Sequence, residues 1–137
     1  MTYLLDTNVL SETRKRQPAT AVADWIAETP PERLHVSVLT LGEIEQGIWR
    51  IRDRGDHEQA VALERWLQEV ERGFADRILP ITLQVASAWG RQQRRSPVPL
   101  VDGLIAATAS VNGLTVVTRN VKDFERSGVQ VHNPFED

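Results

Sequence analysis

The 137-residue chain contains no cysteine, which excludes structural disulfides and thiolate-bound metal sites. It has no apolar run near the roughly 20 residues that a membrane-spanning helix needs. Residues 1–6 also lack the basic start and apolar stretch of a signal peptide, so we expect them to begin the fold. These absences favour a soluble protein without membrane association, and the lack of thiols suits a reducing, cytoplasmic location.

Lysine is scarce, because fourteen of the sixteen basic residues are arginine. The formal net charge is −3, whereas a protein that binds nucleic acid usually presents a basic surface to the phosphates. Arginine does bind phosphate in a forked geometry that lysine lacks. The basic residues gather in three clusters, which are Arg14-Lys15-Arg16, Arg50 with Arg52 and Arg54, and Arg91 with Arg94 and Arg95. Each cluster taken alone is more typical of a solvated helix face.

The hydrophobic fraction of 41% and the charged fraction of 26% are typical of a globular protein, and we expect residues 1–137 to form a single domain. Short apolar runs alternate with helical patterns along the chain. The expected strands cover residues 3–5, 34–36, 77–80, 114–118 and 129–131. The expected helices start at Asp6 and cover residues 19–28, 40–54, 57–72, 82–94, 102–111 and 120–126. This alternation predicts an α/β fold with a parallel sheet and helices on both faces.

Four acidic residues occupy comparable places in this pattern. Asp6 directly follows the first expected strand, Glu43 lies early in the helix after the second, and Asp123 lies in the short helix after the strongest strand. Asp102 opens the alanine-rich helix. Ligands of open α/β sheets bind outside the carboxyl ends of the strands, so we expect these carboxylates to converge. Their mutual repulsion would be relieved by a divalent cation, and hard oxygen ligands favour Mg²⁺ or Mn²⁺.

The same four residues also have a purely structural interpretation. Asp6 can cap the helix that follows it, and Asp102 can be an N-cap or a first-turn acid favoured by the helix dipole. Residues 40–43 match a capping box, and residues 120–123 resemble one. The residues by themselves leave capping and catalysis equally open, and periodicity does not select Glu43 over Glu45.

Longer motifs add a resemblance to a known family. The motifs are Leu4-Leu5-Asp6-Thr7-Asn8-Val9-Leu10, Thr40-Leu41-Gly42-Glu43-Ile44, the alanine-rich segment 102–109, Thr118-Arg119-Asn120-Val121-Lys122-Asp123-Phe124, and the closing Gly128-Val129 and Asn133-Pro134-Phe135. Together they resemble the PIN-domain family, and within it the VapC-type and FitB-like toxins of bacterial toxin–antitoxin pairs. The resemblance covers nearly the whole chain in the order and spacing of the family.

The resemblance implies a three-layer α/β/α fold with a short, mainly parallel central sheet. It implies a metal-dependent endoribonuclease that acts as a toxin, whose cognate antitoxin covers the active site with its tail. It also implies homodimers that assemble with antitoxin into larger complexes, which bind their own promoter through the antitoxin. The family's catalytic and metal-binding acids correspond to Asp6, Glu43, Asp102 and Asp123, and its supporting polar residues to Thr7, Asn8, Ser37, Thr118 and Asn120.

On this basis we expect Asp6, Asp102 and Asp123 to hold Mg²⁺ or Mn²⁺, with Glu43 acting directly or through water. Activated water would cleave RNA to leave 5′-phosphate and 3′-hydroxyl ends. Of the four tryptophans, Trp49 and Trp66 are candidates to line a groove for an antitoxin helix.

Two rival hypotheses remain. The first is a phosphatase or phosphotransfer domain with Asp6 as the phosphate acceptor, which would need a lysine nearby in a chain whose only lysines are Lys15 and Lys122. The second is a catalytically inactive PIN-like scaffold that binds protein or nucleic acid. The complete set of four acids argues against that scaffold.

Overall fold

A five-stranded, entirely parallel sheet forms the centre of the computed structural model, which describes residues 1–136. The strands are β1 (Tyr3–Leu5), β2 (Leu34–Ser37), β3 (Ile78–Leu79), β4 (Thr115–Val117) and β5 (Val131–His132), in the spatial order β3-β2-β1-β4-β5. In the register, Leu4 of β1 lies between His35 of β2 and Val116 of β4. The predicted parallel α/β sheet is confirmed.

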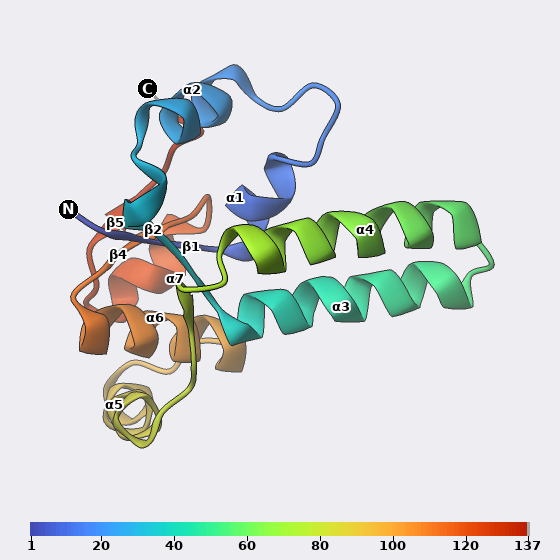
Figure 1. Ribbon diagram of the computed structural model, residues 1–137. Helices are drawn as coiled ribbons and strands as arrows, with labels where there is room; N and C mark the ends of the chain where they lie inside the picture. The colour runs from blue at the N-terminus through green and yellow to red at the C-terminus, as the bar shows by residue number, and fades with distance from the viewer. Residues whose placement is uncertain (137) are drawn as a thin grey trace.

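Helices cover both faces of this sheet (Figure 1). They are α1 (Thr7–Glu12), α2 (Thr20–Glu28), α3 (Val38–Asp53), α4 (His57–Gly73), α5 (Leu83–Arg95), α6 (Leu100–Asn112) and α7 (Val121–Arg126), with a 3₁₀ turn, η1, at Pro31–Arg33. The helices α3 and α4 run side by side as one antiparallel pair, and α5 packs on α6 as a second pair (Figure 1). Within residues 1–136, none of the helices is both long and apolar enough to cross a membrane.

The two layers of helices form because neighbouring strand residues point to opposite faces of the sheet. Leu4 and Val116 are buried against α6 and α7, whereas Leu5 and Val117 are buried against α1, α2, α3 and α4. A parallel sheet that is covered on both sides has continuous apolar strands instead of an alternating pattern. The short apolar runs of the sequence therefore follow directly from the three-layer architecture.

Two helices start two residues earlier than expected, and this changes the interpretation of their acidic residues. The α3 helix begins at Val38, because the Ser37 hydroxyl caps it by accepting the Leu39 N–H at 3.1 Å. The predicted capping box over residues 40–43 is therefore wrong, and Glu43 lies in the second turn. The α6 helix begins at Leu100 after Pro99, so Asp102 is a first-turn residue and not an N-cap.

The last strand is shifted toward the C-terminus relative to the expected residues 129–131. Val131 pairs with Val116 and His132 pairs with Val117, so β5 begins at Val131. The preceding residues turn the chain back toward the sheet, and Gly128 adopts a positive φ of 78° in this turn. The strand can pair with β4 only after this turn is complete.

Candidate active site

The four predicted acids come from four different segments and lie at the carboxyl ends of the strands. Asp6 follows β1, Asp123 lies in the first turn of α7 after β4, and Asp102 lies in the first turn of α6. Burial, together with the charges of Asp6, Asp123 and Glu43, raises the pKa of Asp102 to about 6. The other three carboxylates therefore lie within electrostatic range of Asp102.

Asp6 is the most deeply placed of the four, with 5% of its surface exposed. Its Oδ2 atom accepts hydrogen bonds from the Thr118 hydroxyl at 2.8 Å and from the Asn8 amide at 3.0 Å. Its Oδ1 atom accepts the Thr7 N–H at 2.8 Å, so Asp6 also caps α1 as the structural interpretation expected. Burial raises the pKa of Asp6, while these three hydrogen bonds oppose the rise.

The backbone fixes Asp6 at the end of the sheet. Its N–H donates to the Val117 carbonyl at 2.9 Å, which continues the pairing of β1 with β4 by one residue. The side chain therefore projects from the last paired position of the central strand. Because this bond to β4 and the three side-chain hydrogen bonds restrain that position, Asp6 has little freedom to move.

Asn120 connects the two acids of the α6 and α7 side. Its amide donates to Asp102 Oδ2 at 3.3 Å and to Asp123 Oδ2 at 3.1 Å. Its backbone N–H donates to the Thr118 hydroxyl, which itself binds Asp6. The side chain of Asn120 does not cap α7, so the capping box over residues 120–123 is wrong. The amide instead holds carboxylates from two separate helices.

Glu43 is oriented from the opposite layer of the fold. Its Oε1 atom accepts the Thr7 hydroxyl at 2.5 Å, which joins α3 to the first residue of α1. Glu43 is half-buried and bonded, whereas Glu45 is exposed on the same helix. The tertiary contact therefore distinguishes two acids that periodicity did not separate. A role for Ser37 beyond its cap of α3 stays a prediction.

The donor chemistry of this cluster suits a hard cation, because all four side chains offer carboxylate oxygens. Burial and the negative charges of the other three acids raise the pKa of Asp102. A divalent cation would neutralise those negative charges. In the part of the chain that the structure describes, however, no group of three or more His, Cys, Asp or Glu side chains reaches metal-binding spacing. The charge and ligand type fit Mg²⁺ or Mn²⁺, whereas the side chains stand further apart than bound ligands would.

The PIN domain family model matches residues 3–129. The chain belongs to the PIN-domain family. It is 34% identical to the protein named Toxin FitB of Neisseria gonorrhoeae, over 98% of this chain and 99% of that protein. It is also 32% identical to the VapC ribonuclease Y4jK of Sinorhizobium fredii, over 97% of each chain. The predicted family resemblance is confirmed.

A solved structure supports the same assignment. The crystal structure of FitAcB from Neisseria gonorrhoeae superposes with a TM-score of 0.89 at 33% sequence identity. The match covers 99% of this chain and 100% of the other. The similarity extends over the sheet and both helical layers, so the three-layer PIN fold is established for this chain.

The PIN domain contains one buried carboxylate that sequence reasoning missed. Glu12 at the end of α1 is 6% exposed and binds Lys15 at 2.8 Å and the Ala19 N–H at 2.8 Å. The Lys15 bond and the Ala19 N–H lower the pKa of Glu12. Glu12 therefore orders the segment between α1 and α2. The three-residue spacing of Glu12 and Lys15 was the available signal.

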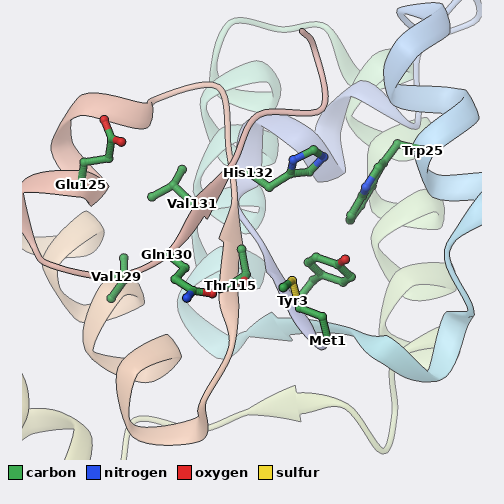
Figure 2. A pocket seen from close by; sticks show the side chains of 9 residues that line it. All are labelled: Met1, Tyr3, Trp25, Thr115, Glu125, Val129, Gln130, Val131 and His132. Carbon is green, nitrogen blue, oxygen red and sulfur yellow. Dashed lines mark hydrogen bonds between the residues drawn. The ribbon is translucent and has the colours of Figure 1, made fainter. Parts of the chain in front are cut away.

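A hollow of about 410 Å³ lies beside β5 (Figure 2). Tyr3, Trp25 and His132 gather on one side of it, with ring centroids 4.9 Å apart for Tyr3 and Trp25 and 5.2 Å apart for Trp25 and His132. Tyr3 and Thr115 open β1 and β4, whereas Asp6 follows the end of β1. None of the predicted site residues lines this hollow.

Proposed function

We propose that this PIN domain is the toxin of a toxin–antitoxin pair and an endoribonuclease that uses Mg²⁺ or Mn²⁺. The observation that carries the proposal is the convergence of Asp6, Glu43, Asp102 and Asp123 at the carboxyl ends of the strands, with Asn120 joining two of them. The relatives named as a toxin and as a ribonuclease support the same activity. A pair of this kind would act on RNA in the cytoplasm.

In the proposed mechanism, Asp6, Asp102 and Asp123 would hold the cation, and Glu43 would contribute directly or through water. A divalent cation in such a site acidifies a bound water and neutralises charge on the phosphate. Thr118 and Asn8 hold the Asp6 carboxylate, Asn120 orients Asp102 and Asp123, and Thr7 orients Glu43. Ser37 supports this arrangement from the start of α3. Water attacks the phosphorus, the P–O3′ bond breaks and the leaving 3′ oxygen takes a proton released by the water, so the products carry 5′-phosphate and 3′-hydroxyl ends.

The proposed partner is a cognate antitoxin, and an apolar hollow offers it a place. This hollow has a volume of about 320 Å³ and lies among α1, α2 and α4, with Leu10, Ile26, Trp66 and Phe74 in its lining. Leu5 and Leu10 flank the segment that carries Asp6, so a chain bound there would pass close to the carboxylates. We propose that an apolar segment of the antitoxin occupies the hollow, and that toxin homodimers join such complexes.

The tryptophan hypothesis therefore favours Trp66 over Trp49. Trp66 lines the apolar hollow from α4. Trp49 is 52% exposed on α3 and lies under the Arg52 guanidinium, 4.6 Å from the ring centroid. This surface cation–π contact accounts for the exposed position of Trp49 without an antitoxin bound to it.

The phosphotransfer alternative receives no support from the surroundings of Asp6. Both of its oxygens accept hydrogen bonds, and its side chain is buried. Lys15 is paired with Glu12, and Lys122 is exposed on α7. The inactive-scaffold alternative has one observation in its favour, which is the wide spacing of the carboxylates among residues 1–136.

The decisive experiment compares the wild-type protein with Asp6→Asn in Mg²⁺-dependent RNA cleavage. We expect a loss of about 100-fold or more, because an amide cannot replace a charged ligand. Glu45→Gln on the exposed face of α3 is the matched control and should cleave at the wild-type rate. Unchanged cleavage by rigorously purified Asp6→Asn would refute the assignment.

Two further measurements separate the alternatives. Induced expression followed by sequencing of RNA ends should yield 5′-phosphate ends and growth arrest. Calorimetric titration should detect Mg²⁺ or Mn²⁺ binding to the wild-type protein that Asp6→Asn weakens. Absence of binding and of cleavage in the wild-type protein would leave the scaffold alternative.

A further inference from the structure

One arginine outside the three basic clusters belongs to the backbone of the candidate active site. Arg119 lies between Thr118, whose hydroxyl donates to Asp6 at 2.8 Å, and Asn120, whose amide joins two further carboxylates. The Arg119 N–H donates to the Asn8 side chain at 3.1 Å, and Asn8 itself donates to Asp6 at 3.0 Å. The main chain of Arg119 is therefore part of the hydrogen-bonded frame that holds the acids, which places its side chain at the rim of the site.

The guanidinium of Arg119 lies on the α1 side of that rim. Asn8 and Glu12 are four residues apart on α1, so they share one face of the helix, one turn apart. Arg119 binds Asn8 through its backbone. The bond to Lys15 is the main cause that lowers the pKa of Glu12, and the positive charge of Arg119 adds a smaller part. The guanidinium is therefore within electrostatic range of Glu12, beside the four carboxylates of the site and not among them.

The ring of Phe135 holds this guanidinium in place. The Arg119 Cζ atom lies 3.7 Å from the ring centroid, which makes a cation–π contact. The ring itself is restrained, because it packs against the hydrophobic core and the Phe135 N–H donates to the Asn133 side chain at 2.9 Å. A guanidinium that rests on a ring keeps the N–H donors at its edge available, and it loses less conformational entropy when it binds a ligand.

None of the ion pairs found within residues 1–136 involves Arg119, and the residue is exposed. The acid in its electrostatic range, Glu12, already uses both of its oxygens. Oε1 binds Lys15 at 2.8 Å, and Oε2 accepts the Ala19 N–H at 2.8 Å. The donors of the Arg119 guanidinium are therefore available to an acceptor from outside the chain.

A phosphate of the RNA backbone is the acceptor that this arrangement fits. The four carboxylates and a net charge of −3 disfavour the approach of a polyanion, and a divalent cation would offset only part of the charge of the four acids. Arginine binds phosphate with two parallel N–H donors, and a stacked guanidinium is already oriented for this contact. Because Arg119 stands beside the carboxylates, it would meet a phosphate next to the one that is cleaved.

We propose that Arg119, held on the ring of Phe135, binds the backbone phosphate next to the cleaved one and so positions the RNA strand at the four carboxylates. This inference rests on the proposed ribonuclease function. It assigns a substrate contact to a residue that the acidic motifs do not include. It also gives a chain of net negative charge a fixed cation at the rim of its site.

The test measures binding of a short single-stranded RNA at low salt in EDTA, where metal-dependent cleavage cannot occur. Arg119→Gln keeps the backbone bond to Asn8 and should weaken binding by about 5- to 20-fold, with a slope of log affinity against log salt that is smaller by about 0.7. The matched control is Arg94→Gln on α5, which removes one exposed arginine on the face of the sheet opposite Phe135. We expect this control to lose less than about twofold.

Two conservative variants separate a substrate contact from a structural role. Arg119→Lys keeps the charge but loses the forked geometry, so it should keep the wild-type salt slope and lose about two- to fivefold in affinity. Phe135→Leu keeps an apolar side chain but removes the cation–π contact, and should also cost about two- to fivefold. If Arg119 only fastened the C-terminal segment to the sheet, Arg119→Gln would lower the melting temperature and leave the salt slope unchanged, which would contradict the proposal.

Cleavage kinetics provide a second measurement. Arg119→Gln should raise the KM for RNA by about 5- to 20-fold with little change in kcat, because the lost contact binds substrate away from the bond that breaks. The same variant should hydrolyse bis(p-nitrophenyl) phosphate at the wild-type rate, since this small diester has only the phosphate that is cleaved.

Three further outcomes would overturn the proposal. Equal loss of RNA binding in Arg119→Gln and Arg94→Gln would mean that only net charge matters. Slower hydrolysis of the small diester by Arg119→Gln would mean that the side chain acts through the carboxylates. RNA cleavage by Arg119→Gln with unchanged KM would disprove the phosphate contact while leaving the ribonuclease function intact. Conversely, a wild-type protein that binds RNA through Arg119 without cleaving it would support the contact and refute the proposed ribonuclease function.

Discussion

The two helix pairs on opposite faces of the sheet, α3–α4 and α5–α6, do similar work by different means. Each pair delivers one carboxylate to the candidate site, Glu43 from α3 and Asp102 from α6. In the α3–α4 pair, large side chains such as Ile48 and Leu63 fill the space between the helices and the sheet. In the α5–α6 pair, the backbone of α6 comes close to a ring, because a Cβ on Gly103 would lie 3.0 Å from Trp89.

The pairs also differ in charge and in their link to the site. The α3–α4 pair mixes acids and bases and is joined by the Arg52–Glu64 ion pair. The α5 helix has arginines and no acids, and Gln93 fastens its end to the connection that leads to Asp102. The α5–α6 pair therefore links the packing of its helices to the geometry of the candidate active site, whereas the far ends of α3 and α4 serve mainly stability.

The largest expected effect distinguishes the carboxylates of the two pairs. Asp102→Asn should reduce Mg²⁺-dependent RNA cleavage by about 100-fold or more, because it removes a proposed cation ligand. Glu43→Gln should cost about 10-fold, since its amide oxygen can still accept the Thr7 hydroxyl. Single-turnover cleavage rates measure both. Equal losses would mean that the two pairs contribute ligands of the same importance.

The next effect concerns matched glycines in the two pairs. Gly103→Ala should destabilise the protein by about 1–3 kcal/mol, because the new methyl group meets Trp89 and Val98. Gly47→Ala in α3 should stabilise it by about 0.5–1 kcal/mol, since a Cβ there meets nothing within 4 Å. Urea denaturation gives both free energies of unfolding. Only Gly103→Ala should also slow RNA cleavage. A Gly103→Ala variant with wild-type stability and wild-type cleavage would contradict the expected difference between the two helix pairs.

A smaller effect follows from the raised pKa of Asp102, which lies at about 6 against an ordinary value near 3.9. Between about pH 4 and 6, the folded protein holds a proton that the unfolded chain has already released. Without a cation, the free energy of unfolding should therefore fall as pH rises through this window. The fall should be only about 1 kcal/mol, because Asp102 is partly exposed and solvent screens its charge. Thermal melts in EDTA measure the fall.

Two controls sharpen this pH prediction. Asp102→Asn should flatten the fall, because the titrating carboxyl is gone. Millimolar Mg²⁺ should reduce it in the wild-type protein and bind more tightly above pH 6, where the carboxyl no longer holds its proton. A fall of the same size in Asp102→Asn would assign the titration to another group.

The smallest effect is expected at the surface of the α3–α4 pair. Arg52→Ala removes the ion pair with Glu64 and the contact with the Trp49 ring, and should cost about 0.5–1 kcal/mol. Cleavage should stay at the wild-type rate, because this end of α3 is remote from Glu43. Denaturation curves at low and high salt test the first expectation. A slower cleavage rate in Arg52→Ala would show that this pair, too, is coupled to the site.

Most of the fold could be predicted from local patterns, because apolar runs and turn residues alternate clearly. The helix starts were less predictable. A capping box fits residues 40–43, yet Ser37 stands three residues upstream of the predicted start and caps the helix in its place. Local hydrogen-bonding patterns of this kind fit more than one start, and the packing of the whole helix selects between them.

Local sequence likewise predicted only some of the residues of the candidate site. The motifs around Asp6 and Asp123 were sufficient to propose them, but nothing local separated Glu43 from Glu45. The Thr7 hydroxyl, 36 positions away in the sequence, makes that distinction in the folded chain.

The parallel α/β architecture and the family follow from the sequence, because they depend on residue order and local propensity. Tertiary contacts decide which oxygens meet and where α6 approaches Trp89. The physical reason is distance: electrostatic repulsion, hydrogen bonding and packing act over a few ångström in space. Such contacts join residues that the chain itself keeps far apart.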